Sequence, residues 1–465
     1  MGLPAGLRSP RCCGNVLEAI GNTPMVEVNN IDTGPCRLFL KLESQNPGGS
    51  IKDRIGLYMI DAAERDGTIK PGGTLVEATA GNTGLGLALV AAQKGYRLQL
   101  VIPDKMSQEK VFHLKAMGAD VIMTRSDVGK GHPEYYQDRA ERLAAESDNA
   151  LYINQFGNPA NPLAHEETTG PEIWSQMDEV VDTVVCGVGS GGTITGLSQF
   201  FARVSPETEM VLADPEGSVL ANYVATGELT DEVGSWLVEG IGEDFLPPIC
   251  DLSRVARAYT IPDAEAFDVC RDVLRKEGII AGTSSGTLMG AALRYCREQT
   301  QPKRVVTFVC DSGNKYLSKV YNDYWMLDQG FIQREVFGDL RDLIARLHDA
   351  HETVTVGSQE TVLAAYSRMK LYDISQLPVM ENDRIVGLVD EEDILLRVFE
   401  KEAQFEEPVS TVMSAKLETL APDAGVQALM PIFDRGMVVI VQDGDTFLGL
   451  ITRIDLLNYL RRRMK

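Results

Sequence analysis

The chain has 465 residues, of which 44% are apolar, and its 44 basic and 67 acidic side chains give a formal net charge of -23 at pH 7. Because this length is more than one hydrophobic core usually holds, we expect about three domains. A protein with that charge repels phosphate backbones, so we expect no nucleic-acid partner.

The N-terminal residues, Met1 to Arg8, lack the apolar core of a secretion signal, and Gly6 stands where a myristoylation site needs Ser or Thr. No apolar run has the roughly 20 residues that cross a membrane. The eight cysteines include no Cys-x-x-Cys pair, and the five histidines form no ligand-spaced cluster with them. We therefore expect a cytoplasmic protein without a membrane segment or a metal site.

The stretch from residue 46 to residue 54 reads Asn-Pro-Gly-Gly-Ser-Ile-Lys-Asp-Arg. Its Pro-Gly-Gly breaks regular structure, Ser50 can cap a helix that starts after it, and the apolar run at 55–60 is able to anchor that helix in a core. Lys52 is then expected in the first turn of this helix, where the helix dipole and partial burial lower the pKa of its amine. A neutral lysine amine forms Schiff bases, so Lys52 is the candidate for the chemistry. The alternative is a solvated surface lysine.

From about residue 14 to residue 325, short β-rich runs alternate with helical ones. Segments such as 84–95 and 134–146 have the length and periodicity of helices. Six runs are predicted as buried parallel strands, namely 75–78, 98–102, 121–124, 184–187, 210–213 and 305–309. This alternation predicts a doubly wound α/β architecture, in which ligands bind beyond the carboxyl ends of the strands.

Three small-residue loops lie where such ligands bind. The loop 79–84, Thr-Ala-Gly-Asn-Thr-Gly, follows a predicted strand and offers backbone N–H groups and an Asn amide to an anion or carbonyl. The glycine-rich loop 187–195 follows another strand, and its Ser190 and Thr193 hydroxyls complete the composition of a phosphate cradle. The third, 281–286, is predicted as a capping turn before a helix at 288–297. Tight helix–strand packing also selects glycine, so each loop alone leaves a packing role open.

The pattern changes after Asp328. The segment Ile385–Leu395, Ile-Val-Gly-Leu-Val-Asp-Glu-Glu-Asp-Ile-Leu, recurs as Phe447–Leu457, Phe-Leu-Gly-Leu-Ile-Thr-Arg-Ile-Asp-Leu-Leu. Two copies of a unit of roughly 60 residues predict a duplicated β-α-β-β-α module in which neither half buries its apolar face alone.

The order of these elements resembles that of the fold-type II pyridoxal-phosphate enzymes. More narrowly, the motifs at 105–110, 238–247 and 323–326 are similar to those of the cystathionine β-synthase family, and the C-terminal repeats resemble the paired CBS domains named after it. The resemblance covers almost the whole chain. It implies an α/β catalytic core of two doubly wound subdomains at 14–327, a linker at 328–339 and paired CBS domains at 340–465, divided at approximately 340–402 and 403–465.

Residue by residue, the resemblance makes Lys52 the residue that binds pyridoxal phosphate covalently and moves the α-proton. Asn82 would hydrogen-bond the phenolic oxygen of the cofactor, and Ser284 would face its pyridine nitrogen. A hydroxyl does not hold a proton on that nitrogen as a carboxylate would, which favours β-elimination from serine over transamination. The residues expected to hold the phosphate are Gly189, Ser190, Gly191, Gly192 and Thr193. Those expected to bind substrate are Thr79, Ala80, Gly81, Thr83, Gln155 and Gly240.

The resemblance implies that L-serine and L-homocysteine are condensed to L-cystathionine and water, a step of transsulfuration and cysteine biosynthesis. Ala80 stands where relatives often have Ser, and Phe156 and Glu243 stand where some have Tyr, so the preference among β-substituted donors stays open. The motifs at 154–162 and 168–173 also look like O-acetylserine sulfhydrylase, a cysteine synthase, which is the alternative enzyme. A second alternative, an inactive ligand-sensing CBS-module protein, is disfavoured by the intact cofactor residues.

We expect no haem, although some synthases of this family carry one on an N-terminal extension. About a dozen residues precede the core, and a thiolate from Cys12 or Cys13 has no nearby axial partner because the first histidine is His113. Fold relatives are usually dimers, so a homodimer or higher homo-oligomer is expected.

Paired CBS domains commonly hold adenosine derivatives between their repeats. The matching positions are Asp390 and Asp393 in the first repeat and Thr452 and Asp455 in the second. The charge of Asp390 disfavours polyphosphates, and the net charge adds a weaker penalty within a screening length of roughly 10 Å. We therefore expect S-adenosylmethionine rather than ATP, at the regulatory residues Thr452 and Asp455. The alternative is a purely structural or dimer-organising module.

Overall fold

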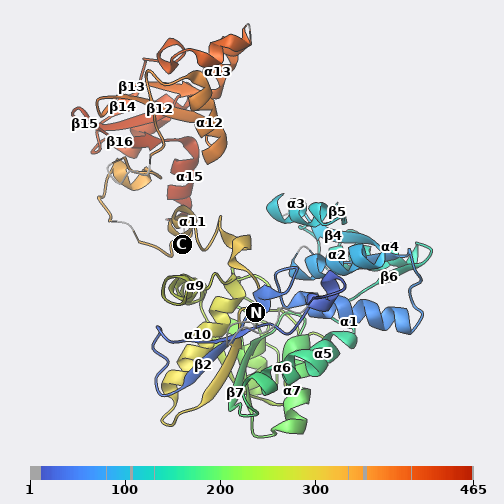
Figure 1. Cartoon of the computed structure of the whole chain (residues 1–465). Coiled ribbons are helices and arrows are strands. Elements are labelled where there is room, and N and C mark those ends of the chain that lie inside the picture. The colour runs from blue at the N-terminus through green and yellow to red at the C-terminus, as the bar shows by residue number, and fades with distance from the viewer. Residues whose placement is uncertain are drawn as a thin grey trace, which may run out of the picture. The chain divides into compact units, whose positions relative to one another are not determined.

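The computed structural model describes residues 12–79, 81–104, 108–129, 131–333, 335–348, 353–399 and 401–462. Internal contacts divide the chain into two compact units, the first ending at Tyr321 and the second beginning at Asn322 (Figure 1). No described helix has the length and apolar character that crossing a membrane demands.

The larger sheet of the first unit has the strand order β1-β2-β10-β7-β8-β9. Its strands are β1 (Met25–Glu27), β2 (Arg37–Lys41), β7 (Thr183–Gly187), β8 (Glu209–Pro215), β9 (Val255–Ile261) and β10 (Arg304–Phe308). β1 pairs antiparallel with β2, and the other pairs are parallel. The side chains of β7, β8 and β10 are mostly buried because helices cover both faces, as predicted for 184–187, 210–213 and 305–309.

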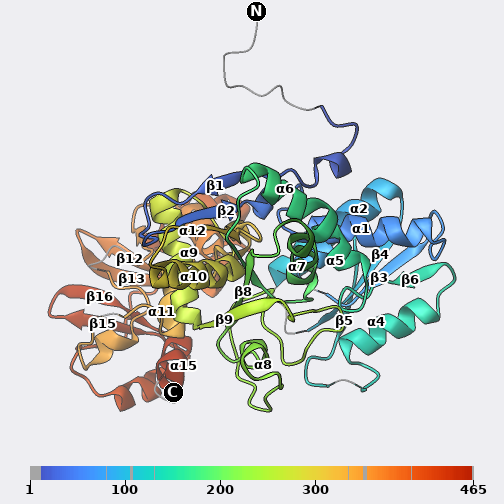
Figure 2. The same ribbon diagram turned by 90° about the horizontal axis from the view of Figure 1, so that it is seen from below.

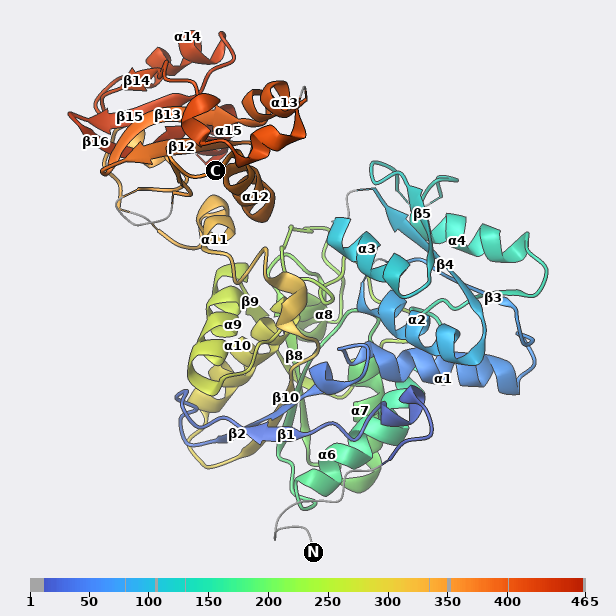
Figure 3. The same cartoon turned by 45° about the horizontal axis from the view of Figure 1, so that its top comes forward.

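Helices flank this sheet on both sides. Figure 3 shows α9 (Asp263–Glu277) and α10 (Thr283–Glu298) on one side and α6 (Gly170–Gln176) and α7 (Gly192–Val204) on the other. With helices on both faces of a mainly parallel sheet, the predicted doubly wound architecture is confirmed for this half.

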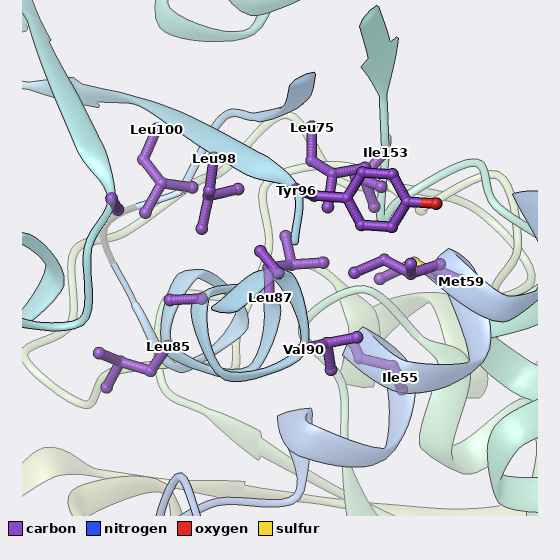
Figure 4. Packing of buried hydrophobic residues seen from close by; sticks show 14 of the residues in the cluster. Ile55, Met59, Leu75, Leu85, Leu87, Val90, Tyr96, Leu98, Leu100 and Ile153 are labelled. Carbon is purple, nitrogen blue, oxygen red and sulfur yellow. The ribbon is translucent and has the colours of Figure 1, made fainter. Parts of the chain in front are cut away.

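The smaller sheet has the order β5-β4-β3-β6 and is entirely parallel. Its strands are β3 (Thr74–Glu77), β4 (Arg97–Pro103), β5 (Asp120–Thr124) and β6 (Ala150–Tyr152). Figure 2 shows α1 (Lys52–Arg65) and α2 (Asn82–Lys94) on one face and α4 (Tyr136–Ala145) on the other. Alternating side chains serve the two faces: Leu75 and Leu98 pack against α1 and α2 (Figure 4), whereas Val76 and Val101 pack toward α4.

The prediction that 121–124 is buried is wrong. This run forms β5, a strand at the edge of the sheet, and its Met123 side chain is 45% exposed. An edge strand has a neighbour on one side only, so its apolar residues are covered less completely than those of β3 and β4.

The second unit contains α11 (Asp323–Gln329) and two repeats of the predicted β-α-β-β-α order. The first repeat consists of β11 (Val356–Gly357), α12 (Val362–Tyr372), β12 (Gln376–Glu381), β13 (Arg384–Asp390) and α13 (Glu391–Val398). The second consists of β14 (Thr419–Leu420), α14 (Met430–Phe433), β15 (Val439–Asp443), β16 (Thr446–Ile451) and α15 (Arg453–Arg462). In each sheet the first two strands are parallel and the last two antiparallel.

The two repeats share an apolar cluster. Ile385 of the first repeat packs with Ile440 and Phe447 of the second, as expected where neither half buries its apolar face alone. Leu340 and Leu343, which precede the first repeat in the chain, pack into the core of the second. The limits drawn from the sequence for the linker and the two halves remain predictions.

Candidate active site

A cavity of about 790 Å³ lies in the first unit, lined by loops from both of its sheets. The loop that begins at Thr79 follows β3, and the loop that begins at Val188 follows β7, so both leave the carboxyl ends of parallel strands. The predicted residues that line the cavity are Lys52, Thr79, Gly81, Asn82, Thr83, Gln155, Gly189, Ser190, Gly191, Gly192, Thr193, Gly240 and Ser284. Ala80 and the first part of the 105–110 motif lie outside the described residues. The individual roles stay predictions.

Lys52 is the first residue of α1, as predicted, and the Ser50 hydroxyl accepts its backbone N–H at 3.2 Å. The turn before it is held by the segment after β10, because the Ile51 N–H donates to the Cys310 carbonyl at 2.8 Å. Removal from water lowers the pKa of the Lys52 amine, although negative charge on Cys310, Glu243 and Asp311 would oppose the shift. A solvated surface lysine does not fit these surroundings.

The two residues after Lys52 fix α1 to the protein interior. Arg54 is 1% exposed and forms ion pairs of 2.7 Å with both Glu43 and Glu172. Asp53 is also buried and accepts the backbone N–H of Gly48 in the lysine turn. Burial raises the pKa of Asp53 to about 6, against the opposing hydrogen bond from Gly48. Neither residue was assigned a role from the sequence.

The helices that carry Lys52 and Asn82 touch backbone to backbone. A Cβ on Gly86 of α2 would lie 2.7 Å from the Lys52 carbonyl oxygen, and a Cβ on Gly56 of α1 would lie 2.9 Å from the Gly86 carbonyl carbon. Only glycine permits this approach at either position. It places the start of α2 beside the start of α1.

The predicted substrate residues are connected by hydrogen bonds. The Thr83 hydroxyl donates to Gln155 Oε1 at 2.7 Å. The Asn161 amide donates to the Gln155 carbonyl at 2.8 Å and to the Ser190 hydroxyl at 2.9 Å. Asn161 thus joins the predicted substrate loop to the predicted phosphate loop. It lies in the 154–162 motif, but no role was predicted for it from the sequence.

The glycine-rich loop has the geometry of an anion site. α7 begins at Gly192, so its N-terminal N–H groups and the positive end of its dipole face this loop. Gly191 has φ +86°, and a Cβ there would lie 2.4 Å from the Cβ of Cys250. A Cβ on Gly189 would lie 2.6 Å from the Gly240 carbonyl oxygen. A lysine of lowered pKa and a phosphate cradle thus share one cavity, and the residues present fit pyridoxal phosphate.

His165 contacts this loop through the hydroxyl of Thr193. Its Nε2 lies 3.2 Å from the Thr193 hydroxyl and its Nδ1 lies 3.0 Å from the Thr169 hydroxyl. Burial, together with the charges of Lys52 and Arg54, lowers the pKa of His165 well below its usual value. The ring is therefore neutral. One ring nitrogen donates a hydrogen bond to one threonine hydroxyl, and the other nitrogen accepts a hydrogen bond from the second threonine.

The prediction of a capping turn at 281–286 is wrong in its extent, because most of this stretch is already helical. α10 begins at Thr283 rather than near Leu288, so Ser284 lies in the first helical turn. The small residues permit this because the helix packs tightly: a Cβ on Gly286 would lie 2.1 Å from the Ala266 carbonyl oxygen. Ser285 accepts the backbone N–H of Cys310 at 2.9 Å, which connects this turn to the segment behind Lys52.

Sequence reasoning missed the segment 310–316, which follows β10. Cys310 and Lys315 line the cavity, and Asp311 is buried against Asn82. The segment follows a parallel strand as the other site loops do, and that position would have identified it.

The proposed regulatory residues form helix caps in the second unit. Asp455 accepts the backbone N–H of Thr452 at 2.7 Å at the start of α15. Asp390 and Asp393 exchange hydrogen bonds of 2.8 and 3.1 Å at the start of α13. Among the described residues, no three His, Cys, Asp or Glu side chains gather as a metal site. The absence of haem stays a prediction.

Comparison with known proteins agrees with this geometry. The sequence model of the family described as "Pyridoxal-phosphate dependent enzyme" matches residues 16–311, and the CBS domain model matches 341–400 and 409–462. A cystathionine beta-synthase of Dictyostelium discoideum is 36% identical over 462 residues, which covers 96% of this chain and 92% of the relative. A cysteine synthase 1 of Emericella nidulans is 40% identical over 321 residues, which covers 67% of this chain and 86% of the relative. A solved hydrogen sulfide-producing enzyme from Fusobacterium nucleatum is similar with a TM-score of 0.61 and 36% identity, covering 66% of this chain and 100% of that one.

Proposed function

Because this chain belongs to the pyridoxal-phosphate dependent enzymes, and within them to the cystathionine beta-synthase family, we propose that it condenses L-serine with L-homocysteine to L-cystathionine and water. The fold-type II core and the tandem CBS domains expected from the sequence are confirmed. The observation that carries the proposal is the extent of the match. A cystathionine beta-synthase matches 96% of the chain, both repeats included, whereas the cysteine synthase relative matches 67%.

Different residues of the cavity have different roles in this reaction. When bound, pyridoxal phosphate supplies an electron sink for the α-carbon of an amino acid. Lys52, whose lowered pKa favours the neutral amine, takes the α-proton of serine. The loop from Thr79 to Thr83, joined to Gln155, holds the substrate carboxylate. The serine hydroxyl and the α-proton leave as water, the homocysteine sulfur bonds to the β-carbon, and the thiol proton replaces the one lost.

Glu243 is placed to receive the thiol proton. It lines the cavity, and burial raises its pKa to about 8, helped by Asp244 and opposed by the charge of Lys52. The group is protonated below that pH and becomes a proton acceptor above it. We therefore expect kcat/KM for homocysteine to rise as the pH passes through about 8, and Glu243→Gln to remove this rise and lower the rate at pH 9 about 100-fold.

The matched control for this pH profile is Asp244→Asn. Asp244 is an exposed neighbour whose charge helps raise the pKa of Glu243, so its removal should keep the rise and move it to lower pH. A pH profile of Glu243→Gln that superimposes on that of the wild type would contradict the assignment.

The alternative is a cysteine synthase that uses O-acetylserine and sulfide, and the 40% identity of such a relative in the catalytic region favours testing it. Initial rates should be measured with serine, O-acetylserine and cysteine as donors, each with homocysteine and with sulfide. The proposal expects serine with homocysteine to have the highest kcat/KM among pairs that contain homocysteine. Turnover confined to O-acetylserine with sulfide would establish the alternative. A cytoplasmic homodimer is part of the same proposal.

For the second unit we propose that S-adenosylmethionine binds at Thr452 and Asp455 in preference to ATP. The carboxylates of Asp390, Asp393 and Asp455 attract a sulfonium cation and repel a triphosphate. Because Asp455 already caps the helix at Thr452, a ligand has to compete with that contact. Calorimetry on the full chain should give a Kd for S-adenosylmethionine about tenfold or more below that for ATP. Tighter ATP binding would contradict the charge argument, and no heat with either compound would favour a structural module.

A further inference from the structure

We propose that Lys315 and Asp311 are positioning residues that fix the orientation of the Asn82 carboxamide, leaving one of its N–H groups for the ring oxygen of the cofactor. This inference rests on the proposed function, since it needs pyridoxal phosphate in the cavity. It concerns a segment, 310–316, to which sequence reasoning assigned no role.

The Asn82 side chain is held at both ends. Lys315 Nζ donates to Asn82 Oδ1 at 2.6 Å, and Asn82 Nδ2 donates to Asp311 Oδ2 at 2.8 Å. An ammonium group can only donate and a carboxylate can only accept, so the amide has one favourable orientation. A flipped amide would set N–H against the ammonium and oxygen against the carboxylate, and both hydrogen bonds would be lost. One of the two amide N–H donors is still available in the observed orientation.

The two positioning residues have further partners, which for Lys315 lie in the turn that delivers Lys52 and for Asp311 in its own segment. Lys315 Nζ lies 3.4 Å from the Gly49 carbonyl oxygen and 3.5 Å from that of Gly48. Asp311 is 1% exposed, and its Oδ2 also accepts the Tyr316 hydroxyl at 2.8 Å. These contacts set Asn82 relative to Lys52 through one short segment of chain.

The backbone of this segment connects the Lys52 turn to the start of the helix that carries Ser284. The Ser312 N–H donates to the Gly49 carbonyl at 3.1 Å, and the Gly282 N–H donates to the Asp311 carbonyl at 3.1 Å. The first bond secures the Lys52 turn, and the second secures the start of the helix that carries Ser284. A change at Lys315 that acts through Asn82 is therefore expected to alter the cofactor site without unfolding the segment, which keeps these backbone bonds.

The competing explanation is that Lys315 only stabilises the turn through the Gly48 and Gly49 carbonyls. The two explanations predict different effects when Lys315 and Asn82 are replaced together. If Lys315 acts through Asn82, its replacement has no further effect once the Asn82 amide is gone. If it acts through the turn alone, the two replacements are independent and their effects multiply.

The test is a double-mutant cycle on the full chain, with the cofactor removed and then restored by titration with pyridoxal phosphate. Lys315→Met and Asn82→Ala should each raise the Kd about tenfold and move the visible absorbance maximum in the same direction. The double variant should match Asn82→Ala within about twofold. Lys315→Gln, whose amide still donates a hydrogen bond, should regain most of the affinity and the wild-type spectrum.

The matched control is Lys94→Met. Lys94 is a half-buried lysine at the far end of α2, paired with Asp61 and Glu64 at 2.6 Å, and its loss should leave the Kd and spectrum unchanged. Multiplying effects in the double variant, or a Lys315→Met protein with wild-type Kd and spectrum, would overturn the inference alone. A wild-type protein that takes up no cofactor would overturn the cofactor assignment as well.

Discussion

Lys52→Ala should no longer bind pyridoxal phosphate covalently, and its rate of cystathionine formation should fall about 10³-fold or more. Lys52 begins α1 and lines the cavity, and its lowered pKa suits it to its two proposed roles, as the amine that attaches the cofactor and as the base that moves the α-proton. One substitution therefore removes two functions. Borohydride reduction of the wild-type protein followed by peptide mapping should place the label on Lys52.

Two other lysines line the same cavity, so the experiment can distinguish Lys52 from other possible attachment sites. Lys110 and Lys315 are the described alternatives for covalent attachment. Lys315→Met should still carry the label on Lys52, because its amine holds Asn82 and the lysine turn instead. A label on Lys110 or Lys315 in the wild-type protein would show that the attachment site is wrong.

Arg54→Met should destabilise the first unit by about 3–5 kcal/mol, because it leaves the buried Glu43 carboxylate without its ion-pair partner, whereas Glu172 keeps its ion pair with Lys41. Arg54 and Glu43 are almost completely buried, and Glu172 is 13% exposed at the side chain. The chain has two units, so a single free energy of unfolding is not defined, and the midpoint of the transition assigned to the first unit is the quantity to measure. Arg37→Met, which breaks an exposed pair with Glu27, is the control and should leave this midpoint nearly unchanged.

The pH dependence of Arg54→Met gives a second check. In the wild type burial opposes ionisation of Glu172, but the hydrogen bonds and charges of Arg54 and, to a lesser extent, Lys41 outweigh burial and lower its pKa to about 2. That stabilisation is present above the unfolded pKa of Glu, about 4.3, and is lost as the pH falls toward 2. Without Arg54, Lys41 still pairs with Glu172, but burial raises the pKa of Glu43 in the folded state, so acid should stabilise the variant relative to neutral pH. A constant difference between variant and wild type from pH 7 to pH 5 would contradict this account.

Residues whose structure depends on local pattern were predictable. The runs at 184–187 and 305–309 read as buried strands because both of their faces are covered, and β7 and β10 lie inside the larger sheet. The run at 121–124 has a similar composition, but it forms an edge strand. Position within a sheet depends on which strands pair, and the composition of a single run does not contain that information.

Small polar residues at a helix start gave an ambiguous pattern. The Thr283-Ser-Ser-Gly stretch has the composition of a turn, but it forms the first turn of α10, where the absence of a Cβ at Gly286 leaves room for the Ala266 carbonyl. The Thr452 to Asp455 spacing has the same ambiguity, since a threonine with an acidic residue three positions later is also a capping pattern. The structure shows the cap, and a ligand there remains a proposal.

The individual loops of the candidate site could be predicted, but the contacts between them could not. Asn82 lies 229 residues from Asp311 and 233 residues from Lys315 in the chain. Thr83 lies 72 residues from Gln155. No local periodicity connects residues so far apart, so the orientation of Asn82 and the pairing of Thr83 depend on the folded sheets.

We expect this chain to make cystathionine from serine and homocysteine in the cavity that contains Lys52. The most direct measurement is mass spectrometry of the product that the purified, pyridoxal phosphate-loaded full chain forms from isotope-labelled serine and homocysteine. The account predicts cystathionine that carries the serine carbons, in amounts proportional to the bound cofactor, and none above background from Lys52→Ala. Unlabelled or absent cystathionine, with cysteine formed from O-acetylserine and sulfide by the same preparation, would contradict it.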